Sequence, residues 1–475
     1  MIRVGHADEA PPFPEAARTA LGNAQLRRNV RHATDVIRGK RSVVVGETAD
    51  WEALREAGRQ IKEHVLRHLD TYLVQFEAAC TAAGGHVHWA RDADEANATV
   101  IEIMRRHAAS EVIKVKTMTS DETRLNEALA AAGMRPYETD LADLIIQLGQ
   151  DRPSHIVVPA LHRNRTEIRA LFKEQMGLAD LGETPQDLTA AARQFLREKF
   201  LRVPVGFSGA NFLIAETGAV CVVESEGNAR MCLTLPRVLI TLVGIEKVIP
   251  RLDDLEVFLQ LLPRSATGER MNPYNTIWTG VTPGDGPGEF HVILLDNGRT
   301  RVLADEVSRS TLHCIRCGAC LNQCPVYRQT GGHAYGSIYS GPIGAILTPQ
   351  LQALEHSQSL PSASSLCGAC SEVCPVKIDI PEILVQLRRR LVEAGQTPRA
   401  ERLAMKAAAM TFHGAGRLSA AHKVARLVQR PFVRDGHLDR LPGPLRAWTA
   451  TRSLPAVPPQ SFREWWAARG KRDES

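Results

Sequence analysis

The sequence predicts an α/β domain with a largely parallel sheet, a small cysteine-rich helical domain, and a helical C-terminal segment. Three observations carry this prediction. Short apolar runs alternate with helical patterns across residues 51–300, which is typical of βαβ units. Seven of the ten cysteines then gather between residues 314 and 374. Alanine-rich helical patterns and a proline- and tryptophan-containing end follow residue 394.

These changes in composition predict four parts of the chain. We expect them at residues 1–50 (an N-terminal arm), 51–300 (the α/β domain), 301–394 (the cysteine-rich domain) and 395–475 (the C-terminal segment).

Hydrophobic periodicity predicts the elements within these parts. The arm should be irregular apart from a helical segment near 21–37, and one long amphipathic helix should run from Trp51 to the glycine pair at 84–85. Gly218 should lie in the turn of a hairpin within residues 203–223. The expected strands lie at 86–90, 112–116, 156–159, 238–243 and 290–295, and the expected helices at 94–107, 119–133, 185–200 and 249–262.

The cysteines form two related runs, which are the only internal repeat that we find in the sequence. The first run reads C-x2-C-x2-C-x3-C-P, the bacterial ferredoxin spacing for a 4Fe–4S cluster. Two-residue gaps let three thiolates converge on one cluster, whereas the fourth cysteine of such a run serves the other cluster. We therefore predict two iron–sulfur clusters, one held by Cys314, Cys317, Cys320 and Cys374, and one by Cys324, Cys367 and Cys370.

The second set is one thiolate short. A complete second run would begin three residues before Cys367, where the chain carries Ser364. The second centre is therefore a 3Fe–4S cluster, or a 4Fe–4S cluster with an open or oxygen-ligated iron, and the spacing does not choose between them.

Zinc and disulfides are the alternatives for these cysteines. C-x2-C pairs are also typical of structural zinc, but zinc sites use two pairs with four ligands. An odd total of seven and the x3-Cys-Pro ending do not suit that arrangement. Disulfides are disfavoured because nothing marks the chain for an oxidising compartment.

Composition points to a cytoplasmic protein. Hydrophobic residues at 44% and charged residues at 23% are ordinary for a globular protein of 475 residues. Glu246 and Lys247 interrupt the most apolar stretch, 238–249, which is too short to span a membrane. The N-terminus lacks the apolar core of a signal peptide.

The net charge of +5 is unevenly distributed. Residues 382–475 hold 18 Lys and Arg against 8 Asp and Glu. A basic tail suggests an anionic partner surface, a peripheral contact with a membrane, or nucleic acid. The charges are scattered, as on a solvated helical face, and no nucleic-acid module accompanies them, so we expect no nucleic-acid partner.

Two polar segments of the α/β domain are candidates for a small-anion site. Residues 114–120, K-V-K-T-M-T-S, join a strand to a helix N-terminus, where anions bind readily. Residues 224–230, E-S-E-G-N-A-R, follow another strand and could line the same cleft. Gly206 and Gly209 flank a hairpin, so they do not form a nucleotide-binding loop.

The remaining cysteines and one histidine have plainer interpretations. Cys80, Cys221 and Cys232 lie in apolar surroundings and are expected in the core. His313 adjoins the first ligand, but the thiolate set is complete without it, so we expect it beside the cluster.

Further stretches, together with the cysteine runs, resemble a known family across nearly the whole chain. They are residues 116–122, 138–141, 153–162, 209–218, 226–230, 339–344, 442–445 and 461–466. The combined pattern is similar to the lactate utilisation protein B family, whose second cluster also has three cysteines. The gap at Ser364 is then the family pattern.

The resemblance implies an iron–sulfur subunit that relays electrons while two sister lactate-utilisation proteins and this chain oxidise L-lactate to pyruvate. The final electron acceptor is unknown. It also implies an α/β domain similar to the ribose-5-phosphate isomerase and coenzyme A transferase fold group. That likeness assigns no catalytic residue.

Three other functions stay open. A self-contained, dehydratase-like enzyme would bind substrate in the α/β cleft and use the open iron as a Lewis acid. A related system would oxidise another 2-hydroxy acid. A redox-responsive regulator would use the basic tail.

Overall fold

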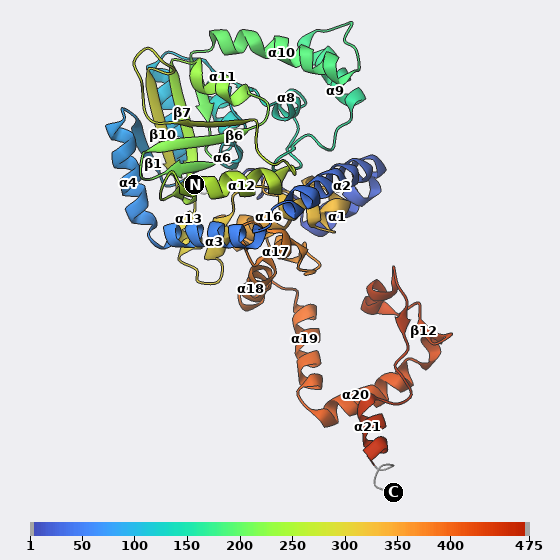
Figure 1. Cartoon of the computed structure of the whole chain (residues 1–475). Helices are drawn as coiled ribbons and strands as arrows, with labels where there is room; N and C mark the ends of the chain where they lie inside the picture. Colours follow the sequence, from blue (N-terminus) through green and yellow to red (C-terminus); the bar gives the residue numbers. More distant parts are fainter. Residues whose placement is uncertain (1–3, 471–475) are drawn as a thin grey trace. The chain divides into compact units, whose positions relative to one another are not determined.

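The computed structural model describes residues 4–470, and the chain divides into two compact units, Met1–Leu391 and Val392–Ser475 (Figure 1). No helix in this described part is long and apolar enough to cross a bilayer.

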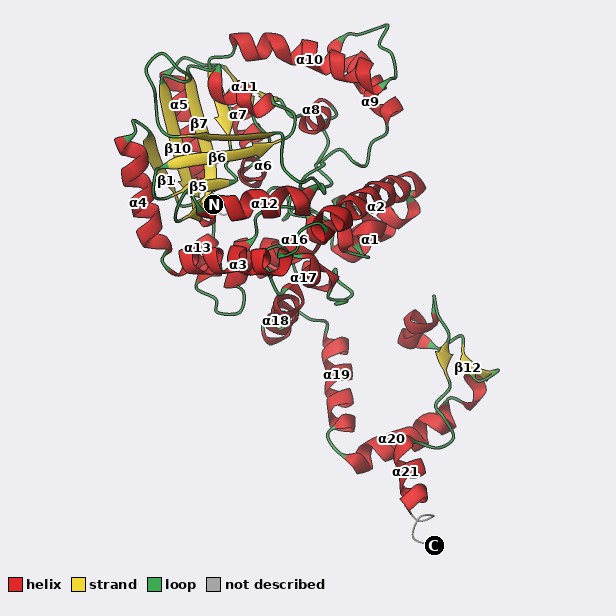
Figure 2. Cartoon of the chain, viewed as in Figure 1, coloured by secondary structure: helices red, strands yellow, loops and turns green. Residues whose placement is uncertain are grey.

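A parallel six-stranded sheet forms the centre of the first unit (Figure 2). Its strands, in spatial order, are β1 (His86–Ala90), β10 (Glu289–Leu295), β7 (Val238–Gly244), β4 (Val205–Ser208), β2 (Glu111–Lys114) and β3 (Arg135–Glu138). Every neighbouring pair is parallel, and the register places His86 opposite His291 and Val238 opposite Glu289. The parallel sheet predicted from the alternating pattern is confirmed.

A second sheet of four strands lies beside the first. It has the order β8 (Val248–Ile249), β5 (Phe212–Ile214), β6 (Ala219–Glu224) and β9 (Tyr274–Trp278). The hairpin turn predicted at Gly218 joins β5 to β6, and φ is +68° there. A Cβ atom on Gly218 would lie 2.3 Å from the backbone nitrogen of Cys80, which belongs to the helix Leu69–Ala82. The turn can pack against this helix only with a glycine at position 218.

Helices cover the sheets on both sides. In chain order they are α1 (Phe13–Gly22), α2 (Ala24–Gly46), α3 (Trp51–Arg67), α4 (Leu69–Ala82), α5 (Ala93–Arg106), α6 (Met118–Thr123), α7 (Leu125–Ala131), α8 (Leu141–Leu148), α9 (Arg165–Met176), α10 (Pro185–Arg202), α11 (Asn228–Thr234), the 3₁₀ turn η1 (Ile245–Lys247), α12 (Asp254–Ala266) and α13 (Arg299–Leu303). Helices α5 and α7 pack on one face of the large sheet, while α4 and the small sheet cover the other.

The structure corrects five sequence predictions. The helix expected at 119–133 is two helices, α6 and α7, because Arg124 between them has φ of +59°. The N-terminal arm is not irregular but mostly α1 and α2. The long helix from Trp51 is two helices, because the backbone of His68 leaves the helical region between α3 and α4. Residues 156–159, expected as a strand, form a loop. The helix expected at 249–262 begins only at Asp254, because Ile249 belongs to β8 and pairs with Ile214 of β5.

The cysteine-rich domain belongs to the first unit and consists of short helices. These are η2 (Arg309–His313), α14 (Ala319–Gln323), α15 (Tyr327–Thr330), η3 (His333–Tyr335), α16 (Gly341–Leu351), η4 (Leu354–His356), η5 (Leu360–Ser362), α17 (Ala369–Val373) and α18 (Ile380–Glu393). One hydrophobic core contains its buried cysteines together with residues of α3, α12 and α18, so the two domains share a core.

The second unit consists of helices and three very short strands. It contains α19 (Arg399–Phe412), α20 (Ala415–Val428), η6 (Arg430–Phe432), β11 (Val433–Arg434), β12 (His437–Leu438), η7 (Gly443–Thr449), β13 (Leu454–Pro455) and α21 (Phe462–Gly470). Neither α19 nor α20 buries a residue.

A closed ring of buried charged groups joins the α/β domain to the cysteine-rich domain. Arg299 of α13 donates through both Nη atoms to Glu122 of α6, at 2.8 and 2.9 Å, and through Nε to Glu246 of η1. Glu246 also accepts from Nη2 of Arg316 at 3.1 Å. The Arg316 guanidinium lies 4.7 Å from the ring of Tyr339, whose hydroxyl donates to Glu122 at 2.5 Å.

We expect Arg299→Met to destabilise the first unit by about 3–5 kcal/mol, because it leaves Glu122 buried without its cation and Glu246 paired with Arg316 alone. Arg299, Glu122 and Glu246 are each at most 1% exposed. Denaturant unfolding followed by circular dichroism measures the change. Arg270→Met is the matched control, because its ion pair with Glu47 is largely exposed and should contribute less than about 1 kcal/mol. Equal effects of the two substitutions would contradict a structural role for the ring.

Candidate iron–sulfur site and adjoining cavity

The two cysteine runs fold into two copies of one backbone motif. In the first, Arg316 and Gly318 have φ of +62° and +72°, and α14 follows directly. In the second, Leu366 and Gly368 have φ of +55° and +84°, and α17 follows directly. These left-handed residues turn the chain sharply around each C-x2-C pair, and α14 packs against α17.

Ser364 occupies the corner of the second motif that Cys314 occupies in the first. The Sγ atom of Cys314 accepts a hydrogen bond from the backbone N–H of Arg316 at 3.4 Å. The Oγ atom of Ser364 accepts the equivalent bond from Leu366 at 3.1 Å. The serine therefore retains the local conformation of a ligand-bearing loop and places an oxygen where the first motif places a sulfur.

Electrostatic proximity divides the thiols into two groups. The first group contains Cys314, Cys317 and Cys374, and the second contains Cys324, Cys367 and Cys370. After burial, the main causes that raise the pKa of Cys317 are Cys314 and Cys374. For Cys370, whose pKa is raised to about 12, the cysteines involved are Cys324 and Cys367. Cys320 lies between the groups, close to Cys314, Cys317, Cys370 and Cys374.

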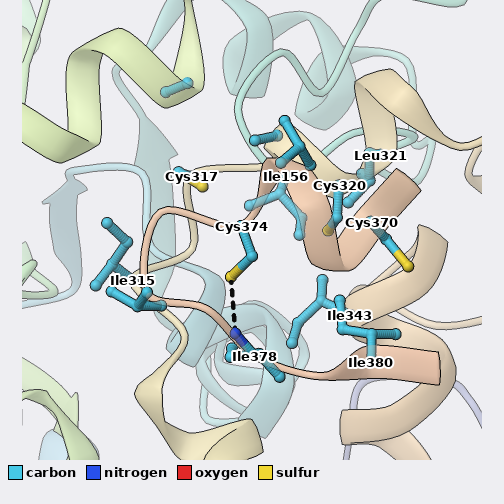
Figure 3. Packing of buried hydrophobic residues seen from close by; sticks show 14 of the residues in the cluster. Ile156, Ile315, Cys317, Cys320, Leu321, Ile343, Cys370, Cys374, Ile378 and Ile380 are labelled. Carbon is cyan, nitrogen blue, oxygen red and sulfur yellow. Dashed lines mark hydrogen bonds between the residues drawn. The ribbon is translucent and has the colours of Figure 1, made fainter. Parts of the chain in front are cut away.

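The cysteines are set in an apolar core, as Figure 3 shows for four of them. Burial raises the pKa of Cys374 to about 11, and its Sγ accepts the backbone N–H of Ile378 at 3.4 Å. Thiols with such raised pKa values carry charge only when a metal binds them. Cys367 differs from these cysteines because it is exposed at the surface.

Cationic side chains surround the first group. Arg55 donates to the carbonyl oxygen of Cys374 at 3.0 and 2.8 Å, and Arg41 donates to that of Val373 at 3.2 Å. Lys62 and Lys247 are only 2% and 8% exposed, and burial lowers their pKa to about 7 and about 8. Buried cations require a nearby anion.

The cations are only partly satisfied within the protein. Nη1 of Arg316 and Nε of Arg41 are buried and make no hydrogen bond anywhere in residues 4–470. A cluster with four thiolates is anionic, so these surroundings fit an iron–sulfur cluster at the first group. At the second group the fit rests on its thiols and on the buried Tyr335 hydroxyl beside Cys324.

A cavity of about 380 Å³ lies at the carboxyl ends of the large sheet's strands, next to the first group. Among the residues lining it are Lys116, Thr119, Asn211, Glu224, Ser225, Glu226, Asn228, Lys247 and Arg316. Arg316 stands between Cys314 and Cys317, so one residue of the cysteine loop forms part of the cavity wall.

Both polar segments predicted from the sequence contribute to this one cavity. Lys116 donates to the carbonyl oxygen of Val157 at 2.9 Å, which holds the loop after α8 over the cavity. Lys114, the other candidate lysine, lies outside the lining and is 1% exposed in an ion pair with Glu138 at 2.5 Å. Arg230 also lies outside the lining, over the ring of Tyr274.

The pKa of one carboxyl group of the cavity, that of Glu226, is raised above its ordinary value. Burial of this carboxyl group, followed by the charge of Asp140, raises the pKa, although the residue as a whole is exposed. The cavity therefore has cationic groups toward the cysteines and a proton-exchanging acid on another wall.

The sequence analysis missed Lys247 and Arg316 as cavity residues. Charged residues inside an otherwise apolar stretch were the available signal for Lys247. Arg316 carried no such signal, because only the tertiary structure brings the cysteine loop to the sheet edge.

The cysteines and the histidine expected to be structural lie in the core. Cys80, Cys221 and Cys232 are fully buried, and burial raises the pKa of Cys80 to about 11. His313 is 6% exposed, and burial followed by Lys62 lowers its pKa to about 3. Gly206 and Gly209 have packing roles, since Cβ atoms there would lie 2.2 Å from Cys232 O and 2.3 Å from Thr117 Oγ1.

Comparison with known proteins defines the class first. Residues 73–295 match the LUD domain, residues 310–378 match the 4Fe-4S dicluster domain, and residues 388–471 match "Lactate utilisation protein B, C-terminal". The chain is therefore an iron–sulfur protein in which an α/β LUD domain precedes a dicluster domain and a helical C-terminal part.

Whole-chain relatives then define the family. Lactate utilization protein B of Bacillus licheniformis is 43% identical, with 97% of each chain covered. The proteins of that name from Shouchella clausii and Bacillus subtilis are each 42% identical, with 97% and 96% of each chain covered. The chain belongs to the lactate utilization protein B family. Among solved structures, a DUF162 family protein from Deinococcus radiodurans is 13% identical, covering 48% of this chain and 98% of its own, with a TM-score of 0.28.

We expect Cys314→Ser and Cys374→Ser each to remove the iron of the first group and to weaken iron binding at the second, because α14 and α17 pack together. Iron and acid-labile sulfide analysis of anaerobically purified protein measures the loss. Cys80→Ser is the matched control, since Cys80 is buried against the hairpin turn and belongs to a different hydrophobic cluster from the buried cysteines of the runs. Loss of iron in the control would contradict its assignment as a core residue.

We expect Ser364→Cys to increase iron retention at the second group, because the serine already holds the ligand-loop conformation. Iron per chain after exposure to air, and electron paramagnetic resonance (EPR) of the oxidised protein, report the change. An oxidised 3Fe–4S signal near g = 2.01 in the parent should decrease in the variant. Ser365→Cys, one residue farther along the loop, should leave both measurements unchanged; an equal response would show that position 364 has no special geometry.

Proposed function

We propose that this chain is the electron-transfer subunit of a cytoplasmic complex that oxidises L-lactate to pyruvate and allows growth on lactate. Cys314, Cys317, Cys320 and Cys374 would hold a 4Fe–4S cluster, and Cys324, Cys367 and Cys370 a second cluster of 4Fe–4S or 3Fe–4S type. One-electron transfer is the chemistry that such clusters supply when bound. The partners would be two sister lactate-utilisation proteins and an acceptor of unknown identity.

The observation that best supports the proposal is the contrast between the two thiol groups. The first group lies against the cavity through Arg316, whereas the second reaches the surface at Cys367, where Leu366 is also 38% exposed. The two ends of the domain therefore face different surroundings, as a relay between two partners requires.

The protein's own residues would set the properties of the first group. Arg41, Arg55, Lys62, Lys247 and Arg316 place positive charge around its thiols. Positive charge stabilises the more negative, reduced form of a redox centre and raises its reduction potential. Near the second group, Arg388 donates to the carbonyl oxygens of Pro361 and Ser364, as Arg55 does to that of Cys374 at the first.

The second unit would provide contacts for the partner proteins. Helices α19 and α20 bury none of their own residues and expose apolar side chains. These include Leu403, Met405, Met410, Phe412, Val424, Leu427 and Val428. The basic charge of this region would also suit a peripheral contact with a membrane.

A self-contained enzyme is the second candidate, and the cavity with Glu226 favours it. That mechanism needs the incomplete cysteine set to face the substrate. None of the residues described as lining the cavity is Cys324, Cys367, Cys370 or Ser364. This arrangement favours the relay. The oxidation of another 2-hydroxy acid and the likeness to the ribose-5-phosphate isomerase and coenzyme A transferase folds remain predictions.

The proposal is tested by mixing the anaerobically purified, oxidised protein with L-lactate, with and without the two sister proteins. We expect bleaching of the cluster absorbance and an S = 1/2 EPR signal only in the complete mixture, since the relay needs a partner to oxidise lactate. About eight irons per chain would indicate two cubanes, and about seven a 3Fe–4S second centre. Turnover of substrate by the chain alone, without an acceptor, would overturn the relay.

A further inference from the structure

A group of histidine and glutamate side chains lies at the amino-terminal ends of the large sheet's strands, at the opposite end from the cavity. Glu289 and His291 stand two residues apart near the start of β10, so their side chains share one face of the strand. His107 directly follows α5, which packs against the same strand. One potential ligand atom from each of the three lies within 4.8 Å of the other two.

His291 is oriented as a metal ligand would be. Its side chain is 2% exposed, and its Nδ1 lies 3.1 Å from Nε2 of His88 on the neighbouring β1. A metal-bound histidine characteristically uses its second ring nitrogen in such a hydrogen bond, which fixes the ring. Nε2 of His291 is buried and makes no hydrogen bond within the described chain.

In the tautomer that donates from Nδ1 to His88, the Nε2 lone pair of His291 is directed toward His107 and Glu289. Arg106 adds positive charge nearby, and the carboxylate of Glu289 opposes it.

Glu289 completes the donor set. Its Oε2 is paired with Nε2 of His107 and lies 3.8 Å from Nε2 of His291. Two imidazoles and one carboxylate are a common protein donor set for zinc and similar dications, with at least one position left open.

A second histidine and acid group in the same unit shows the contrast. Both ring nitrogens of His162 are hydrogen-bonded, Nδ1 with Ser154 at 2.8 Å and Nε2 with Asp151 at 2.9 Å. Nε2 of His333 is hydrogen-bonded with the carbonyl oxygen of Arg152 at 2.7 Å. Asp151 also pairs with Arg163 at 2.6 Å. These nitrogens are satisfied by the protein, so that group needs no ion.

We propose that His107, Glu289 and His291 bind one divalent transition-metal ion, with zinc as the best-suited probe, and that His88 positions His291 for it. The site lies at the amino-terminal ends of β1 and β10, away from the cysteines and the cavity. A bound ion would tie the end of α5 to the sheet. The site is independent of the proposed electron-transfer role.

The test uses the full-length, cluster-loaded protein, equilibrated with limiting zinc under anaerobic conditions. Elemental analysis should find about one zinc per chain in addition to iron. Zinc K-edge X-ray absorption should show nitrogen and oxygen neighbours at about 2.0–2.2 Å, without the sulfur shell at about 2.3 Å that zinc in a cysteine site would produce. A sulfur shell, or no bound zinc, would overturn the proposal.

Variants assign the ligands. His107→Ala and Glu289→Gln affect partly exposed residues, so the fold should persist, and each should lower zinc affinity at least about tenfold. His88→Ala should lower it about 10- to 100-fold, as expected for a positioning residue, while iron content and circular dichroism stay unchanged. His32→Ala, an exposed histidine of α2, is the matched control. If His107→Ala and Glu289→Gln bind zinc as tightly as this control, the contact of His107 with Glu289 is a plain ion pair.

Discussion

The buried charged ring of Glu122, Arg299, Glu246, Arg316 and Tyr339 is the constraint on which the architecture of the first unit depends. Its members come from α6, α13, η1, the first cysteine loop and the turn before α16, so five segments must be in place before the charges are satisfied. Burying such charges is unfavourable unless each finds its partner. The ring therefore fixes the position of the cysteine loop relative to the carboxyl edge of the sheet.

That fixed position gives the cavity its character. Glu246 and Lys247 directly follow β7 at the carboxyl end of the sheet. Both line the cavity, and Glu246 is also bonded to Arg316. Two of the cationic groups that compensate the charge of the first cysteine group, Lys247 and Arg316, are therefore also groups that a ligand in the cavity would meet. Any small anion bound there would lie close to Arg316, and its charge would act on the neighbouring thiolates over a short distance in a medium of low polarity.

The two cysteine motifs share a backbone but not an environment. The first lies inside the protein among arginines and lysines, and the second opens to the surface at Cys367. Ser364 accepts the same hydrogen bond as Cys314 in the first motif, so the three-cysteine set of this chain lies in an intact loop rather than in a loop of another shape. The two sites of one module can thus differ in exposure, charge and ligand set.

The sequence by itself determined the features that depend on local spacing. The ferredoxin-type runs, the hairpin turn at Gly218 and the strands at 86–90 and 290–295 follow from residue type and period, which act over a few neighbouring residues. Only the tertiary structure decided what long-range packing controls. The irregular loop at 156–159 held by Lys116 and the meeting of Arg316 with Glu246 depend on partners far away in the chain. Sequence period carries no information about such pairs, because it describes each element alone and not the surface against which the element packs.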